Sequence, residues 1–466
     1  MHAKRIAIFN QGRGKQRGAA LMVMLVIMIM GAAIFLVSSL NSSALQIKRD
    51  EITAASLAQA RDALIGYAAS VQIDWTTCGA AGNNCKRLGD LPCPDTNNSG
   101  IAGTSCGNAS GSTGQSQRLG RLPWRTLGLP DLRDGSGERL WYAVSNNFKN
   151  NTRTTCTSSG QTGCLDSDTT GTISVFAPDG TLLNDGGGST GAVAVIIAPG
   201  DVLQRQGGTL QDRSSAGVNT ASNYLDVATV GGNTEDNASF TDGSSTNGFI
   251  QGRIKDSNGN TIVNDQLLVI SQDNIMQAIQ KRVAGEVKQC LNEYALQNNG
   301  RYPWAARVST FSLSYSDTSN QLFGRVPDTS FYSTNNDSNG FMDDHWVGNC
   351  NINSSSGWWL NWKEMVFYGL ADAYKPASPV WHWWSGWTWP PAPACPTCLA
   401  VNPPSATADK QFVVLVAGKM LSGQVRSSTA NKGTLSNYLE GANTNGASPF
   451  AQGQPSATFN DTTVFQ

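Results

Sequence analysis

Residues 15–40 read KQRGAALMVMLVIMIMGAAIFLVSSL, and this stretch decides what kind of protein the sequence predicts. The run from Ala19 to Leu40 is almost entirely apolar, and as a helix it would rise about 33 Å, enough to cross the core of a bilayer. Residues 1–18 contain no acidic residue, and their basic residues are Lys4, Arg5, Arg13, Lys15 and Arg17. Because basic flanks stay in the cytoplasm, we expect residues 19–40 to be a single transmembrane helix in the inner membrane, with the body in the periplasm.

The helix is expected to continue beyond the apolar run. From Ala44 to about Val71 the sequence has no proline, and its only glycine is Gly66. Apolar residues recur at steps of three and four, the spacing of one face of an amphipathic helix; they are Leu57, Ala60, Leu64, Tyr67 and Val71. The sequence therefore predicts one helix of roughly fifty residues, half in the membrane and half packed on a globular body.

The junction KQRG at residues 15–18, directly before the apolar run, resembles the class III leader of type IV pilins and pseudopilins. In that family a prepilin peptidase cuts after the glycine. The resemblance implies a leader at 1–18, cleavage at Gly18 and methylation of Ala19. Two other interpretations of the segment are open: a secretory signal cut near SSA at residues 42–44, and an uncleaved anchor.

One position departs from this family. Pilins usually carry Glu as the fifth mature residue, where its charge pairs with the terminal amine of a neighbouring subunit; counted from Ala19, the fifth residue here is Val23. A carboxylate without that partner is costly in lipid, so a subunit with no neighbour ahead of it is better without one. The K-type pseudopilin of type II secretion and some minor pilins look similar. The resemblance thus implies a minor subunit, of the kind located at a filament tip.

The rest of the chain repeats itself. Short motifs of the first half return in the same order in the second half: GRLPW at 120–124 as GRYPW at 300–304 (with a variant, GRVP, at 324–327), RSS at 213–215 as RSS at 426–428, and SNYLD at 222–226 as SNYLE at 436–440. Their common order indicates two homologous modules. We place the first at 41–262 and the second at 263–466.

Each module is expected to begin with a helix and to end in short strands, and the second helix is expected from about Gln272 to Gln297. Runs rich in β-branched residues between turn residues predict strands at Ile173–Ala177, Val193–Ala198, Gln266–Ile270 and Phe412–Ala417. The predicted fold class is α+β: a long N-terminal transmembrane and amphipathic helix followed by two duplicated pilin-like heads. Each head is expected to be a helix packed on a short antiparallel sheet, as the resemblance implies.

Composition favours an extracytoplasmic protein, because only 14% of the residues are charged, and the net charge of −1 gives no reason to expect nucleic acid as a partner. The ten cysteines indicate disulfides formed in an oxidising compartment. Most lie in close pairs: Cys78 with Cys85, Cys93 with Cys106, Cys156 with Cys164, and Cys395 with Cys398, leaving Cys290 and Cys350. For CPTC at 395–398 a zinc site is the alternative, but no second CxxC or HxxxH pair completes it.

Few residues suggest catalysis or a cofactor. The histidines, His2, His345 and His382, are too few for most histidine-based metal sites or Ser-His-Asp triads, so we expect no enzyme and no catalytic residue. One oxygen-rich run before a glycine resembles the start of a calcium loop; its candidate ligands are Asn335, Asp337, Asn339 and Asp343. The run from Asp95 to Gly100 is a weaker candidate. Neither has the closing Glu of an EF-hand, and such clusters are usually turns.

Nine of the thirteen tryptophans lie between Trp346 and Trp389, and the corresponding region of the first module has none. The module fold therefore does not need them. This Trp-rich loop, residues 346–391, is either a local core or a surface that binds a partner subunit, a glycan or a lipid headgroup. The candidate partner-binding residues are Trp381, Trp383, Trp384, Trp387 and Trp389.

Together these features predict a minor pilin or pseudopilin that is inserted in the inner membrane and processed by prepilin peptidase. It would assemble with other pilin or pseudopilin subunits into a type IV pilus or a type II secretion filament. The alternative is a filament-tip adhesin that binds through the Trp-rich loop. A less favoured alternative is a membrane-anchored periplasmic enzyme, for which paired carboxylates such as Asp343 and Asp344 are the candidates.

Overall fold

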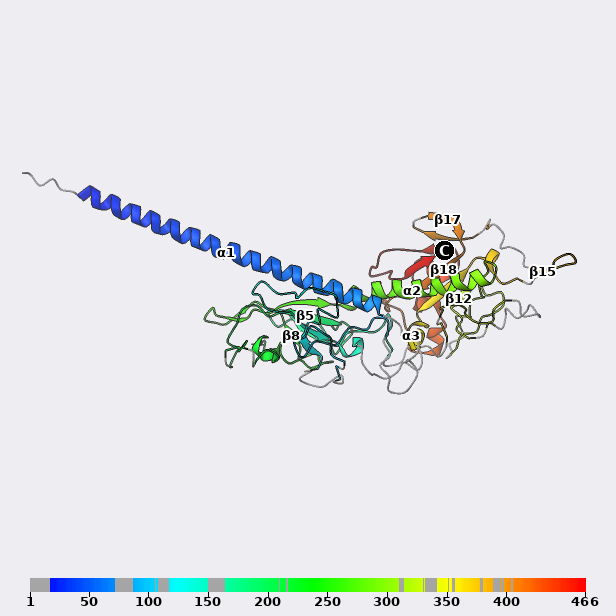
Figure 1. Cartoon of the computed structure of the whole chain (residues 1–466), viewed down its shortest axis with the longest axis horizontal. Helices are drawn as coiled ribbons and strands as arrows, with labels where there is room; N and C mark the ends of the chain where they lie inside the picture. Colours follow the sequence, from blue (N-terminus) through cyan, green and yellow to red (C-terminus); the bar gives the residue numbers. More distant parts are fainter. Residues whose placement is uncertain are drawn as a thin grey trace, which may run out of the picture.

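In the computed structural model, one long helix projects from a body of two lobes that lie side by side along the long axis, and the C-terminus is in the second lobe (Figure 1). Within residues 17–43 the structure describes the backbone and the side chains of Met28 and Met30. The residues that the structure describes are 17–71, 87–104, 106–107, 117–149, 164–208, 210–214, 217–309, 314–329, 331, 342–350, 352–353, 357–377, 380–388, 395, 398–403 and 405–466.

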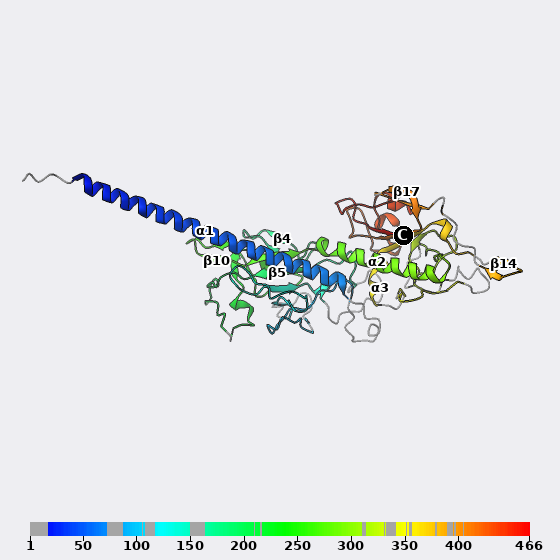
Figure 2. The ribbon, with the colours of Figure 1, turned by 45° about the horizontal axis from the view of Figure 1, so that its top comes forward.

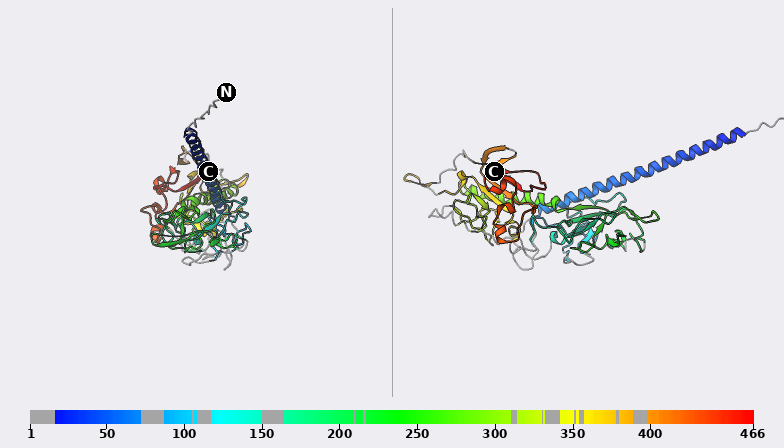
Figure 3. Two further views of the ribbon diagram at one scale, coloured as in Figure 1. Left: turned by 90° about the vertical axis from the view of Figure 1, so that its left-hand side faces the viewer. Right: turned by 180° about the vertical axis from the view of Figure 1, so that it is seen from behind.

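Helix α1 spans Arg17–Ser70 and contains no proline, which would break the hydrogen-bonding ladder of a helix. Its C-terminal part belongs to the body, because the side chains of Leu57, Ala60, Leu64 and Ala68 are buried. This part packs against the first sheet. The N-terminal part of α1 stands clear of both lobes, from the front and from behind (Figure 1, Figure 3).

The first lobe is built on a four-stranded antiparallel sheet in the order β1-β2-β5-β11. Its strands are β1 Leu119–Arg121, β2 Trp141–Val144, β5 Ala194–Ala198 and β11 Gln266–Ile270. Side chains alternate between the two faces of a strand: Tyr142 and Ile196 join the core beneath α1, whereas Trp141 and Ile197 join a second core on the opposite face. The sheet is therefore covered on both faces.

The second lobe repeats this layout. Its four-stranded antiparallel sheet has the order β12-β13-β18-β20, with strands β12 Phe323–Arg325, β13 Val366–Leu370, β18 Phe412–Val416 and β20 Thr462–Phe465. Helix α2, Gln272–Gln297, begins with a capping box of Ser271 and Asn274 and packs against β18 and β20. Helices α1 and α2 contact each other (Figure 2), so one hydrophobic core runs through both lobes.

Equivalent side chains of the two lobes make equivalent hydrogen bonds. In each lobe an arginine donates to the carbonyl oxygen of a glycine beyond the third strand of the sheet, and a buried asparagine donates to a buried aspartate. The pairs, first lobe before second, are Arg213 with Gly200 (2.7 Å) and Arg426 with Gly418 (3.0 Å), then Asn237 with Asp265 (2.8 Å) and Asn443 with Asp461 (2.9 Å). Strand β11 follows residue 262, where the first module was expected to end, yet it completes the first sheet.

The remaining strands of the described chain form small sheets. The order β4-β3-β8 joins Leu182–Asn184, Val175–Phe176 and Phe249–Ile250, and the order β17-β16-β19 joins Ser405–Lys410, Leu399–Asn402 and Phe450–Ala451. The two-stranded ribbons are β6 Val227–Val230 with β7 Asn233–Asp236, β9 Ile254–Lys255 with β10 Thr261–Val263, and β14 Val380–His382 with β15 Gly386–Thr388. The other two α-helices of the described chain are short: α3 Gly357–Trp362 and α4 Thr429–Lys432.

The predicted fold class is wrong. The described chain is a mixed structure of seven sheets and four α-helices, not a membrane helix with two heads of one helix and one sheet each. The pairs β3–β8 and β16–β19 are parallel. The physical reason is that turn residues divide the long connections into short segments, which pair locally instead of remaining loops.

The membrane prediction is wrong as well. Among the residues that the structure describes, no helix combines the length and the apolar character needed to cross a membrane. The expected transmembrane half at 19–40 and the single-pass location in the inner membrane are therefore not supported.

Candidate functional site

The projecting part of α1 carries exposed apolar side chains. Leu45 is 66% exposed and Ile47 is 60% exposed; nearer the free end, Met28 and Met30 are 68% and 59% exposed. Ile52, one turn above the buried part, is still 42% exposed. Apolar side chains exposed in series along an isolated helix indicate a contact with another molecule. We call residues 28–47 of α1 the free helix segment.

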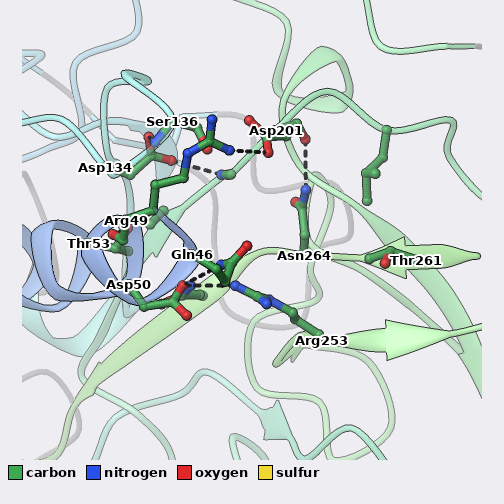
Figure 4. Close-up of a pocket in the computed structure, with 14 residues that line it drawn as sticks. Gln46, Arg49, Asp50, Thr53, Asp134, Ser136, Asp201, Arg253, Thr261 and Asn264 are labelled. Carbon is green, nitrogen blue, oxygen red and sulfur yellow. Dashed lines mark hydrogen bonds and ion pairs between the residues drawn. The ribbon is translucent and has the colours of Figure 1, made fainter. Parts of the chain in front are cut away.

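Charged residues surround α1 where it enters the body (Figure 4). Arg49 pairs with Asp201 at 3.1 Å, and Asp50 pairs with Arg253 at 2.8 Å. These four residues, which we call the collar, border a cleft of about 210 Å³. All four side chains are about half exposed, so each pair contributes less than about 1 kcal/mol to stability. The collar positions the helix more than it stabilises the fold.

A close approach between α1 and the loop before β2 fixes the helix at the same place. The backbone N–H of Gly135 donates to Oγ1 of Thr53 at 2.9 Å, and Oγ of Ser56 donates to the carbonyl oxygen of Arg133 at 2.7 Å. A Cβ atom at Gly135 would lie 2.2 Å from the carbonyl oxygen of Arg49, so only glycine fits against the helix. The direction in which α1 leaves the body is therefore set by its contacts with this loop.

The collar was not identified from the sequence. Its signal is the run KRDE at residues 48–51, a cluster of charges directly after the apolar stretch. The partners Asp201 and Arg253 carry no such signal, because they lie in unrelated loops that the fold brings to the helix.

Of the predicted processing residues, Gly18 and Ala19 lie in the first turn of α1, at its free end. The rest of the KQRG junction before Arg17 is outside the described residues.

The tryptophans of the Trp-rich loop divide into two groups. Four are buried in the main core of the second lobe: Trp346, Trp358, Trp359 and Trp362. Trp346 donates through Nε1 to the carbonyl oxygen of Pro327 at 2.9 Å, and Trp359 donates to Asp328 at 3.0 Å. For these four the local-core interpretation holds.

The second group lies on the hairpin of β14 and β15. Trp383 and Trp384 form its turn and are 84% and 67% exposed. Their rings meet edge to face with centroids 5.4 Å apart, and the ring of His382 lies 4.9 Å from Trp384. Trp381 and Trp387 are partners in the backbone register of β14 and β15, and Trp389 lies outside the described residues. Two exposed indoles on a hairpin turn are a typical recognition surface.

This Trp hairpin is at the end of the molecule opposite to the free helix segment (Figure 1, Figure 2). The chain thus presents two apolar surfaces, one at each end of its long axis, with both lobes between them. A molecule of this shape can be held at one end while the other contacts a partner.

The stronger of the two predicted calcium sites falls largely outside the described residues. Asn335, Asp337 and Asn339 lie outside the described residues, and the Asp343 carboxylate accepts a hydrogen bond from Nδ2 of Asn298 at 3.1 Å. No group of three or more His, Cys, Asp or Glu side chains in the described chain could hold a metal. The Asp95 carboxylate, in the other run, accepts the backbone N–H groups of Asn97 and Gly100 at 3.0 and 2.6 Å, which is an ordinary turn.

The described cysteines are bonded. Disulfides join Cys93 to Cys106, Cys290 to Cys350 and Cys395 to Cys398, and Cys164 is also disulfide-bonded. Cys78, Cys85 and Cys156 lie outside the described residues. The link from Cys290 joins α2 to the loop that contains Trp346, so it ties the tryptophan core to the second helix.

Comparison with protein-family models, curated proteins and solved structures found no match for this chain.

Proposed function

We propose that the chain is a minor, pilin-like subunit of a filament of the type IV pilus or type II secretion kind, and that it assembles through the free helix segment. The observation that supports this proposal is the series of exposed apolar side chains on a helix that leaves the body. The occupant of that surface is the corresponding helix of neighbouring pilin or pseudopilin subunits. When two apolar helix faces pack together, their side chains are removed from water, and this burial stabilises the contact.

The KQRG junction supports the same proposal, because a prepilin peptidase cutting after Gly18 would leave Ala19 as the first residue of the assembly helix. The absence of Glu at Val23 supports a minor subunit over the bulk component. The collar and the glycine contact at its base would hold the helix at a fixed angle, so that each subunit enters the filament in one orientation.

Site-specific photo-crosslinking in the native host tests the assembly surface. A photoreactive amino acid at Leu45 should produce adducts with other pilin-like subunits, because this side chain is on the free helix segment. The matched control is Leu210, which is 65% exposed, nearly as much as Leu45, but lies in the first lobe. Adducts of equal yield at both positions, or none at Leu45, would overturn the proposal.

A second role rests on the Trp hairpin. We infer that the chain also binds a partner through Trp383 and Trp384, as an adhesin located at a filament tip would. The double variant Trp383→Ala/Trp384→Ala should reduce, at least tenfold, the attachment of the producing cells to the surface on which they normally attach. The number of filaments per cell should stay unchanged. Loss of filaments together with attachment would show that the hairpin serves assembly, and unchanged attachment would remove the adhesin role.

A further inference from the structure

The Trp hairpin, which consists of β14, β15 and the turn between them, projects past the second lobe at the end farthest from the free end of α1 (Figure 1, Figure 3). At its tip Trp383 and Trp384 are 84% and 67% exposed, and the next residue, Ser385, is also exposed. The planes of the two indoles are at 89° to each other, so they do not form one flat platform. The tip is a projecting apolar surface, whereas sites for small ligands are concave.

The sequence around the hairpin carries no charged residue. From Pro376 to Ala408 it contains no Asp, Glu, Lys or Arg, although 14% of all residues in the chain are charged. This uncharged run is longer than the one that contains the free helix segment, residues 19–47. A charged side chain strongly opposes entry into a membrane. A protein or glycan partner imposes no such restriction, because protein interfaces have a polar rim and glycans are held by polar groups. The absence of charge therefore favours a lipid surface.

The backbone at the tip is already hydrogen-bonded. The three residues of β14, Val380–His382, each pair with a residue of β15 in antiparallel register. In the turn, the backbone N–H of Ser385 donates to the carbonyl oxygen of His382 at 3.2 Å. Backbone groups without partners oppose entry into lipid, so a closed hairpin can approach a bilayer more readily than an open loop.

The repeated fold does not require this hairpin. The sheet β4-β3-β8 of the first lobe corresponds to β17-β16-β19 of the second, because in each sheet the middle strand has one antiparallel and one parallel neighbour. The hairpin lies between β13 and β16, and the corresponding segment of the first lobe, between β2 and β3, is 145–174. That segment has no tryptophan, and it contains four charged residues: Lys149, Arg153, Asp166 and Asp168. The neutral tryptophan tip is an addition to the second lobe, which indicates recognition more than folding.

Tryptophan prefers the boundary between a membrane and water, where its ring lies among the lipid headgroups and its N–H stays hydrated. We propose that Trp383 and Trp384 insert the tip of the hairpin into the interface of a bilayer whose surface is neutral and zwitterionic, such as phosphatidylcholine. The uncharged tip matches the charge of that surface. This inference rests on the binding role proposed for the Trp hairpin, and it identifies the partner as a lipid surface.

The test uses the full chain with the environment-sensitive fluorophore NBD attached at Ser385→Cys, labelled without reductant so that the disulfides stay intact. With phosphatidylcholine vesicles the emission should rise and shift to the blue, because the fluorophore leaves water. The matched control carries the same label at Ser427→Cys, another exposed serine of the second lobe, and its emission should stay unchanged. Each label reports its own position, so contacts of the free helix segment with the vesicles do not produce the signal.

Two double variants are compared in the chain labelled at residue 385. Trp383→Ala/Trp384→Ala should weaken partitioning into phosphatidylcholine vesicles at least tenfold. Leu182→Ala/Leu183→Ala, which removes two side chains of β4 that are 37% and 53% exposed, should leave it unchanged. Because the tip is uncharged, partitioning should be the same at low salt and in about 0.5 M salt, which screens electrostatic attraction. If circular dichroism shows that the tryptophan variant is not folded, Trp383→Asp supplies the decision, because its charge opposes entry into the membrane.

The proposal is overturned if the label at residue 385 stays in water with phosphatidylcholine, if it responds only to anionic vesicles, or if the label at residue 427 responds equally. Equal losses in the tryptophan and the leucine variants would overturn it as well. The adhesin role fails separately, when cells that carry Trp383→Ala/Trp384→Ala attach normally. Lost attachment together with a label that stays in water would mean that the hairpin binds a protein or a glycan, which removes the lipid inference and keeps the adhesin role.

Discussion

Leu64→Ala in α1 tests the division of this helix into a buried part and a free part. Leu64 is fully buried in the core that α1 shares with the first sheet and α2. Truncation removes three buried carbon atoms and leaves a cavity, which costs about 3 kcal/mol for a buried leucine in a well-packed core. This free energy corresponds to about a 150-fold larger ratio of unfolded to folded chain.

The matched control is Leu45→Ala on the free helix segment. The chemical change is the same, but Leu45 is 66% exposed, so the free energy of unfolding should change by less than about 0.5 kcal/mol. The assay is urea unfolding of the disulfide-intact full chain, followed by the fluorescence of the buried tryptophans and extrapolated linearly to water. Equal destabilisation by both variants, or a loss below about 1 kcal/mol for Leu64→Ala, would refute the assignment of the buried part of α1 to the core.

Two further predictions concern buried charges. Burial raises the pKa of Asp166 to about 7 and that of Asp226 to about 6, above the value of about 4 in an unfolded chain. The folded chain therefore holds protons that the unfolded chain has already lost, so the free energy of unfolding should fall as the pH rises from 5 to 8. Asp166→Asn should make this fall with pH less steep. A free energy of unfolding that rises over the same range would contradict the prediction. Lys363 pairs with Asp328 at 2.5 Å, and both side chains are buried. Lys363→Met should therefore lower the free energy of unfolding by about 3–5 kcal/mol, because it leaves the carboxylate without its ion-pair partner. Arg253→Met in the half-exposed collar should lower it by less than about 1 kcal/mol. If urea unfolding showed that both variants lose the same free energy of unfolding, burial would not control how much each ion pair contributes to stability.

The sequence predicted the elements that depend on local periodicity. The spacing of Leu57, Ala60 and Leu64 predicts the buried face of α1, and these side chains are buried in the structure. Helix α2 occupies Gln272–Gln297, the expected range, because its apolar repeat is a local signal. Strand β11 likewise matches its expected residues.

What depends on tertiary contacts could not be predicted in the same way. The doublets at Trp358 and at Trp383 look alike in sequence, yet the first is in the core and the second is exposed on a hairpin. Most strands of the small sheets were missed because strands of two to four residues carry too short a pattern to be distinguished from turns.

The proposed function requires that this chain is processed so that its assembly helix starts at Ala19. Intact-mass and N-terminal peptide mass spectrometry of the chain isolated from its native host tests this claim most directly. The account predicts a mature chain that begins at Ala19 and carries a methyl group on its terminal amine. An intact Met1, or a mature chain that begins at Leu45, would contradict it.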